Sequence, residues 1–306
     1  MGVPRLALAP CARVLACGGA GNRVRSRSVT SPALSRPSPV SQRGAAVSRK
    51  TLRIATWNIA SNRNYDAVAA KLAELDVDVC ALQEVAIDPA VGLPVLFGHG
   101  QGSASGYCWH FAPALMPAEV YHGTGQYFGL AIASRIPLSR TAMFQLGPPG
   151  TGSVVHVENE PRILQVAALP LERPVFIGNT HLATAGDWEL SAMRRSQAGK
   201  VAGMLRPLAT QGPVILCGDF NAGPSSSDLV AIKEALPYFH SSDRGTFAEE
   251  FGRPPIDFFC SSIALDVRIS VFPPDGLSDH SIVVATLNDV ASGASAALRP
   301  AHPSFE

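Results

Sequence analysis

The sequence predicts an α/β protein in which two β-sheets pack against each other and helices cover their outer faces. Apolar segments of strand length alternate with segments of helical periodicity along residues 51–288. Such interleaving over this length favours a two-sheet sandwich covered by helices. The chain of 306 residues is 46% hydrophobic and shows neither an internal repeat nor a central linker. We therefore expect one domain with a sizeable core.

The first half of the domain is expected to begin with a strand, a helix and a second strand. The first strand covers residues 52–58, and the helix covers 66–75, where Val68, Leu72 and Leu75 recur at helical spacing. The second strand covers residues 77–84. Pro and Gly turns separate the segments that follow. These four strands are expected at residues 127–134, 138–146, 162–169 and 175–181.

The second half of the domain contains two more expected helices and two more strands. Residues 188–205 carry apolar side chains near one helical face, and residues 228–236 form a shorter helix. An apolar strand that starts at Ile215 lies between these helices, and a last strand covers residues 282–287. Helices and strands thus alternate to the end of the domain.

The strand that starts at Ile215 stops abruptly at the sequence Gly-Asp-Phe-Asn. Asp219 and Asn221 are two residues apart, so an extended chain points both to the same side. A carboxylate beside a carboxamide suits the binding and deprotonation of a water molecule. Because Asn, Asp and Gly are also common in turns, these residues alone leave catalysis and a simple turn as alternatives.

Other expected strands begin or end on polar residues of the same kind. The motifs are Thr-Trp-Asn at Asn58, Leu-Gln-Glu at Glu84, Thr-His-Leu at His181, Ile-Asp at Asp257, and Ser-Asp-His at Asp279 and His280. Together with Gly-Asp-Phe-Asn, this ordered series resembles the endonuclease/exonuclease/phosphatase superfamily, the DNase I-like metal-dependent phosphoesterases. The resemblance covers roughly residues 51–288. It implies a four-layer αββα sandwich of two mostly antiparallel sheets flanked by helices.

The chemistry that this resemblance implies is hydrolysis of a phosphate ester. Phosphate oxygens repel a nucleophile, so the site must supply a cation, an activated water and a hydrogen-bond donor for the developing charge. Glu84 is the expected ligand of Mg²⁺ or Mn²⁺, because a carboxylate at a strand end suits these hard cations. The resemblance adds Asn58 and Asp279 to the surroundings of the ion.

The remaining motif residues are expected to act on the water and the phosphate. Asp219 is the candidate general base, and Asn221 orients the water or the phosphate. His280 donates a hydrogen bond to the phosphoryl oxygens, while Asp257 holds its other ring nitrogen. His181, the other histidine of the family pattern and the first along the chain, is expected to contact the same phosphate.

Arg162 and the missing partner of His181 bear on the substrate. Arg162 matches an arginine often found in the family, which implies a phosphate clamp, and an ion pair with Glu158 or Glu160 is the alternative. Nucleases of the DNase I type have a Glu that partners the first histidine. No carboxylate lies between Glu119 and Glu158 here, so we expect His181 to lack that partner. This departure disfavours a DNase I-like role.

Residues 1–50 differ in composition from the rest of the chain. They contain nine basic residues and many Ser, Ala and Pro, and the first acidic residue is Asp66. This composition is typical of a mitochondrial or plastid transit peptide. Arg13 and Pro10 interrupt the apolar run that a secretory signal needs, and Leu6 breaks the myristoylation pattern. The alternative is that these residues are a disordered basic arm, or that the start codon is placed too far upstream. In either case we expect a cytoplasmic protein.

Charge and composition narrow the substrates and partners. Removing the nine basic residues of the leader from 25 leaves 16 basic against 24 acidic residues, a net charge of −8. An acidic domain gains little non-specific attraction to a polyanion, which weakens the case for a nucleic-acid substrate without excluding it. Small molecules and lipid head groups are the other candidate substrate classes. We expect no membrane span and no obligate protein partner. Residues 289–306, rich in Ala, Ser and Pro, are expected to be a disordered tail.

A binding module that keeps the fold without catalysis is the alternative from a different class of function. Degenerate members of such a family usually lose a metal ligand or the base. All the motif residues are present in this chain. The sequence therefore favours an enzyme.

Overall fold

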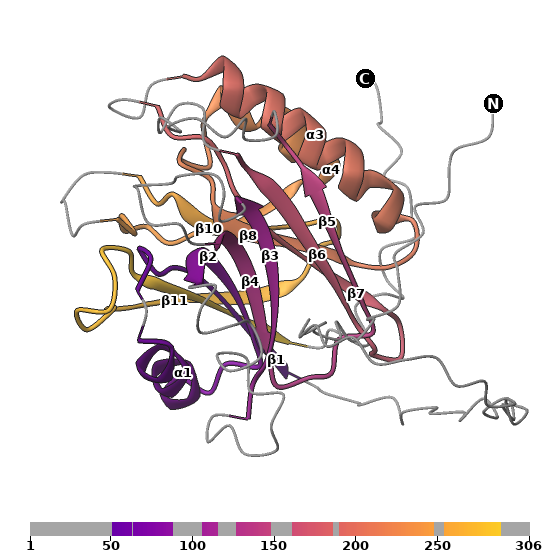
Figure 1. The fold of residues 1–306 in the computed structure, drawn as a ribbon. Coiled ribbons are helices and arrows are strands. Elements are labelled where there is room, and N and C mark those ends of the chain that lie inside the picture. The colour runs from indigo at the N-terminus through magenta and orange to yellow at the C-terminus, as the bar shows by residue number, and fades with distance from the viewer. Residues whose placement is uncertain are drawn as a thin grey trace, which may run out of the picture.

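A computed structural model describes residues 51–62, 64–87, 106–115, 127–147, 161–185, 190–247 and 254–288. In this part of the chain two six-stranded sheets face each other, and helices lie against their outer faces (Figure 1). The predicted four-layer sandwich of two mostly antiparallel sheets is confirmed. The expected leader, residues 1–50, and the expected tail, residues 289–306, lie outside the described residues.

Each sheet contains one parallel pair of strands among antiparallel neighbours. Across the first sheet the strands are β11 (Asp266–Phe272), β12 (Ile282–Asn288), β1 (Thr51–Asn58), β2 (Val79–Ile87), β4 (Tyr127–Ser134) and β3 (Cys108–Leu115). Across the second they are β5 (Arg140–Gln145), β6 (Ile163–Leu169), β7 (Val175–His181), β8 (Val214–Asp219), β10 (Asp257–Ser261) and β9 (Tyr238–His240). The parallel pairs are β1 with β2 and β7 with β8.

A helix connects the two strands of each parallel pair. Helix α1 (Tyr65–Glu74) follows β1 and precedes β2, and α3 (Ala192–Ala209) follows β7 and precedes β8. Parallel neighbours need such a crossover because the chain must return to the same end of the sheet. After β8 come a short 3₁₀ turn, η3 (Ser227–Leu229), and helix α4 (Val230–Ala235).

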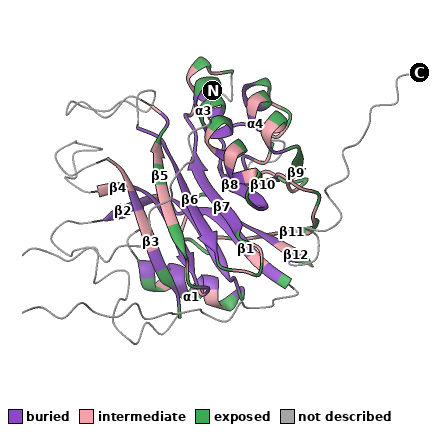
Figure 2. Cartoon of the chain, turned by 90° about the vertical axis from the view of Figure 1, so that its right-hand side faces the viewer, coloured by how far each residue is buried: buried purple, intermediate pink, exposed green. Residues whose placement is uncertain are grey.

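The core consists of three apolar layers, which is the pattern that a four-layer sandwich requires. Between the sheets, Ile54, Ile177 and Phe259 pack with other buried side chains. One outer layer lies between α1 and the first sheet and includes Leu72. The other lies between α3, α4 and the second sheet and includes Val201. Figure 2 shows the resulting gradient, with β6, β7 and β8 buried while the outward faces of the helices are exposed.

The structure differs from the expected elements mainly at edges and helix starts. Strands β3, β9, β10 and β11 were not predicted. Strand β3 contains Pro113, which an edge strand accommodates because one of its sides needs no hydrogen-bond donor. Helix α3 begins at Ala192 rather than residue 188, because Ser191 caps it by accepting a hydrogen bond from the backbone N–H of Arg194.

Candidate active site

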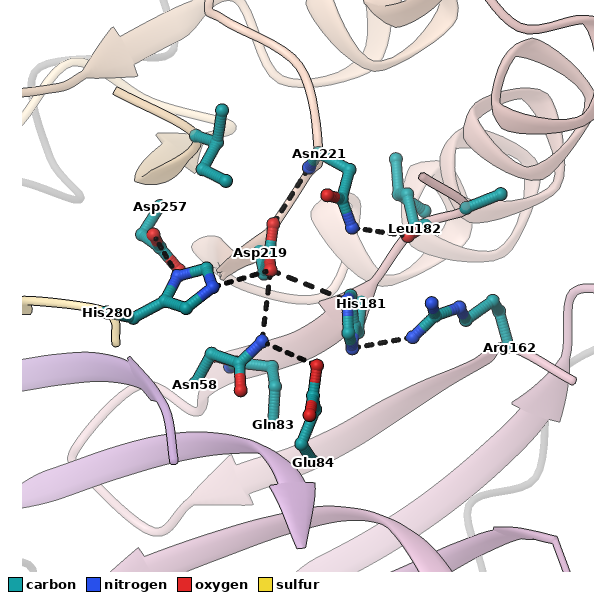
Figure 3. Close-up of polar contacts among 12 residues, drawn as sticks. Asn58, Gln83, Glu84, Arg162, His181, Leu182, Asp219, Asn221, Asp257 and His280 are labelled. Carbon is teal, nitrogen blue, oxygen red and sulfur yellow. Dashed lines mark hydrogen bonds and ion pairs between the residues drawn. The ribbon is translucent and has the colours of Figure 1, made fainter. Parts of the chain in front are cut away.

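Strand register brings the ends of both parallel pairs to one edge of the sandwich. Asn58 lies opposite Gln83 in the first sheet, and His181 lies opposite Asp219 in the second. Asp257, at the start of antiparallel β10, also lies opposite Asp219. Figure 3 shows the polar side chains converging from both sheets. They belong to Asn58, Glu84, His181, Asp219, Asn221, Asp257 and His280.

The backbone is strained at two of these positions. Glu84 has φ 54° and lies where the pairing of β2 with β4 shifts register. Asn221 has φ 48°. The left-handed region costs about 1 kcal/mol for an L-residue, and such residues cluster at functional sites. At Gly218 (φ 150°) an added Cβ would lie 1.9 Å from the backbone oxygen of Thr180, so only glycine permits the close pairing of β7 with β8.

Asp219 lies at the centre of the site. Its Oδ2 accepts a hydrogen bond from Asn58 Nδ2 (3.1 Å), and its Oδ1 accepts one from the backbone N–H of Asn221 (2.9 Å). Burial, followed by the negative charge of Asp257, raises the pKa of Asp219 to about 7, although His280 and the hydrogen bonds oppose the shift. The carboxyl group is therefore poised to take up and release a proton near neutral pH.

His280 is held as a cation by carboxylates. Burial alone would lower its pKa, but Asp257, followed by Asp219, raises it to about 10. His280 Nδ1 lies 2.9 Å from Asp257 Oδ2, and Nε2 lies 3.7 Å from Asp219 Oδ2. Thr246, which lies in none of the sequence motifs, donates a hydrogen bond of 2.6 Å to the same Asp257 oxygen. The ring is thus fixed with its Nε2–H towards the general-base candidate.

His181 has a cation as its neighbour. Arg162 Nη1 lies 2.6 Å from His181 Nδ1, and both side chains are buried. Burial, then Arg162 and His280, lowers the pKa of His181 well below its ordinary value. Its Nε2 lies 3.4 Å from Asp219 Oδ2. Glu158 and Glu160, the alternative partners of Arg162, lie outside the described residues.

Of the residues expected to surround a metal ion, Glu84 contacts Asn58. Asn58 Nδ2 lies 3.1 Å from both Glu84 Oε1 and Asp219 Oδ2, so two carboxylates converge on one group. Asp279 is exposed, and its neighbour Ser278 donates a hydrogen bond to the backbone oxygen of Asn58. Hard oxygen donors suit Mg²⁺ or Mn²⁺, so the carboxylates of Glu84 and Asp279 and the amide oxygen of Asn58 have the right chemistry for such an ion. Glu84 lies inside β2, which continues to Ile87, and not at the strand end that the sequence predicted.

Another acidic cluster lies on the other side of Asp219. Among the described residues, Asp219, Asp257 and His280 offer ligand atoms that lie within 4.8 Å of one another. Asp257 Oδ1 is buried and has no hydrogen-bond partner. Asp219 therefore adjoins both the Glu84 carboxylate and this cluster.

Helix α3 anchors the loops that carry His181 and Asn221. Arg194 and Asp228 form a fully buried ion pair of 2.9 Å. Arg194 Nη1 also donates hydrogen bonds to the backbone oxygens of Asn221 (2.7 Å) and Ala183 (3.3 Å). Asn221 Nδ2 in turn donates to the backbone oxygen of Leu182 (3.0 Å). A single guanidinium thus links the segments that follow β7 and β8.

Buried amides connect the two sheets close to the site. Gln83 Nε2 donates to Asn179 Oδ1 (2.8 Å) and to Thr56 Oγ1 (3.1 Å). Asn179 Nδ2 donates to the backbone oxygens of Leu82 and Ala131 in the opposite sheet, both at 3.0 Å. Sequence reasoning did not single out these amides. The sequence feature that could have identified them is a polar residue inside an otherwise apolar strand, one or two positions before a motif residue.

Comparison with known proteins identifies the family of this chain. The model of the Endonuclease/Exonuclease/phosphatase family matches residues 55–280, which contain the motifs from Asn58 to His280. The chain belongs to this family. Members of the family are hydrolases that act on phosphoester bonds, and enzymes with this fold generally depend on a divalent metal for activity. A search of curated protein sequences finds no match to this chain.

Solved structures of the family share the fold at low sequence identity. An endonuclease/exonuclease/phosphatase from Beutenbergia cavernae is 23% identical, with a TM-score of 0.60 over 78% of this chain and 72% of that chain. The human Nocturnin catalytic domain with a bound sulfate anion is 24% identical, with a TM-score of 0.58 over 78% and 95%. ANGEL2, a 2',3'-cyclic phosphatase, is 15% identical, with a TM-score of 0.57 over the same shares.

The helices of this family member give no indication of a membrane span. In the part of the chain that the structure describes, none is both long and apolar enough to cross a bilayer.

Proposed function

We propose that the protein is a Mg²⁺- or Mn²⁺-dependent phosphoesterase that hydrolyses a phosphodiester or phosphomonoester by attack of a water molecule. The observation that carries the proposal is the environment of Asp219. This buried carboxyl group has a pKa of about 7 and adjoins two histidines that bring ring N–H donors towards it. A proton acceptor beside such donors suits a reaction that deprotonates water and builds negative charge on phosphate oxygens.

Glu84, Asn58 and Asp279 would hold the metal ion. The bound ion would supply positive charge to the phosphate and lower the pKa of water. Glu84 and Asp219 already converge on Asn58 Nδ2, a partial positive charge.

The other side chains act on the water and the phosphate. Asp219 removes the proton of the attacking water. Its Oδ2 accepts a hydrogen bond from Asn58, and its Oδ1 accepts one from the backbone N–H of Asn221. These two bonds fix the orientation of the carboxylate. His280, a cation held by Asp257, donates Nε2–H to a phosphoryl oxygen. Because water attacks directly, we expect inversion at phosphorus and no covalent enzyme intermediate.

The test is turnover by the full-length chain with Mg²⁺ or Mn²⁺, alongside Asp219→Asn. The substrates are plasmid DNA, RNA, a 2',3'-cyclic nucleotide, mono-aryl and bis-aryl phosphates, and phosphoinositides. General-base removal is expected to lower kcat by about 10²–10⁴-fold. The matched control is Asp266→Asn, an exposed residue at the far end of the first sheet, which is expected to keep full activity.

The metal site is tested in the same assay. Glu84→Gln is expected to need at least about tenfold more Mg²⁺ for half-maximal turnover, because it removes a charged ligand. Glu172→Gln, an exposed change in the turn before β7, leaves this value unchanged. Absence of turnover on every substrate, in a protein that is folded and binds Mg²⁺, would favour the binding module instead.

A further inference from the structure

The two buried histidines of the site have partners of opposite charge on the same ring atom. The Nδ1 atom of His280 faces the carboxylate of Asp257 at 2.9 Å. The Nδ1 atom of His181 faces the guanidinium of Arg162 at 2.6 Å. Strands β6 and β7 run antiparallel with Leu164 opposite Thr180, so the residue that leads into β6 adjoins the end of β7. Figure 3 shows Arg162 approaching His181 from the side away from Asp219.

The contact with Arg162 determines the proton positions of His181. A guanidinium carries only N–H donors and does not lose its proton in a protein. His181 Nδ1 must therefore accept the hydrogen bond, which leaves the ring neutral with its hydrogen on Nε2. That Nε2 lies 3.4 Å from Asp219 Oδ2, so the N–H points to the centre of the site.

We propose that Arg162 is a positioning residue that locks His181 as a neutral Nε2–H donor, so that His181 offers a fixed hydrogen bond at the reacting centre and never serves as a proton shuttle. The state of the ring follows from the contacts alone. Its use during turnover rests on the proposed function. Arg162 thereby acts through His181, which differs from a clamp that touches the phosphate.

The charges around His181 agree with a neutral ring. Arg162 lies at Nδ1, and His280 lies across Asp219, and both cations oppose a further positive charge. Asp219 faces Nε2, and Glu84 is linked to Asp219 through Asn58 Nδ2. These two carboxylates would favour protonation, but burial and the two cations outweigh them and keep the pKa of His181 low.

The direct test is the ¹⁵N NMR spectrum of the His181 ring in the full-length, metal-free protein, assigned with His181→Gln. Between about pH 5 and 8, where histidines ordinarily titrate, we expect a hydrogen on Nε2, none on Nδ1 and no titration. A protonated Nδ1, or a ring that titrates in this range, would overturn the proposal. This measurement needs neither a variant of Arg162 nor any catalytic activity.

Variants of Arg162 then test the cause. Arg162→Met is expected to shift the protonation midpoint of His181 upwards and to mix the two tautomers, while Arg162→Lys keeps the neutral Nε2–H ring. Arg140→Met, which removes an exposed arginine from neighbouring β5, is the matched control and leaves the ring unchanged. An unchanged ring in Arg162→Met, with its amide spectrum showing a folded protein, contradicts the proposal.

Turnover separates the role of Arg162 from the proposed function. On the preferred substrate, Arg162→Met is expected to lower kcat more than it raises KM and to add a new step to the pH profile, which Arg162→Lys removes. A loss confined to KM, with an unaltered pH profile, indicates a phosphate clamp and overturns the positioning role. If the wild-type protein is inactive while its His181 ring is neutral as expected, the proposed function fails and the locked ring stands.

Discussion

Asp219 shows how the fold changes the chemistry of a single side chain. The carboxyl group is 1% exposed, and it accepts hydrogen bonds that by themselves favour its ionised form. Burial and the nearby charge of Asp257 outweigh those bonds and raise its pKa to about 7. The same shift that makes Asp219 a base near neutral pH also makes its ionisation costly to the metal-free protein.

We predict that Asp219→Asn changes how stability depends on pH. Between pH 3.8, the ordinary value, and about 7, the folded protein keeps a proton on Asp219 that the unfolded chain has lost, so this group lowers stability as pH rises. The variant lacks this group. Its free energy of unfolding, relative to wild type, should rise by about 2 kcal/mol from pH 5 to pH 7.

Urea unfolding with a chelator present measures this change. Asp266→Asn, whose carboxyl group is exposed, serves as the control and should follow wild type at both pH values. A constant difference between Asp219→Asn and wild type would show that the pKa of Asp219 is not raised.

At the level of elements, α3 contains ion pairs with different surroundings. The pair of Arg194 with Asp228 is completely buried and also holds the backbone of Asn221. The pair of Arg206 with Glu234 lies on the surface, with side chains 53% and 64% exposed. A single helix therefore offers a buried anchor and a surface pair for comparison.

We predict that Arg194→Met destabilises the protein by up to about 3–5 kcal/mol, because the buried Asp228 loses its buried partner. Asp228 then keeps only the ion pair with the more exposed Arg195, at 3.2 Å. Arg206→Met should cost at most about 1 kcal/mol, as is typical of exposed pairs. Urea unfolding of both variants measures the two values. Equal losses would mean that Arg194 does not anchor the segments that follow β7 and β8.

At the level of the whole molecule, the site exists only because the two sheets face each other in one alignment. Asn58 and Glu84 come from the first sheet, while His181 and Asp219 come from the second. The hydrogen bond between Gln83 and Asn179 spans the sheets beside these residues and leaves little freedom for one sheet to slide over the other. Buried amides with satisfied hydrogen bonds give a core a specific alignment that apolar contacts alone do not.

We predict that Gln83→Leu and Asn179→Leu are strongly coupled. Each single change removes one hydrogen bond from the amide that remains, whereas the double change removes both amides, so the coupling energy should be about 1–3 kcal/mol. A double-mutant cycle by urea unfolding measures it. Gln83→Leu with Asn288→Leu, an exposed residue at the far end of β12, should be additive within about 0.5 kcal/mol. Additivity of Gln83→Leu with Asn179→Leu would rule out a clamp between the sheets.

Local sequence patterns determined the family, the fold class and the position of most motifs near a strand end. Strands 127–134 and 175–181 were predicted with their observed bounds, because apolar runs between Pro and Gly turns depend on short-range chemistry. Edge strand β11 was missed because its half-buried residues give a weaker apolar signal.

Only the tertiary structure decided which motif residues touch and in what state of charge. Several hydrogen bonds of the site join residues from separate strands and loops. They link Arg162 to His181, Thr246 to Asp257, and Asn58 to both Glu84 and Asp219. The charge states follow from the same packing, since burial and neighbouring charges shift the pKa of Asp219 and His181. Strand register and burial arise when distant segments pack together. The sequence pattern around each residue therefore contains its chemical type but not its partner.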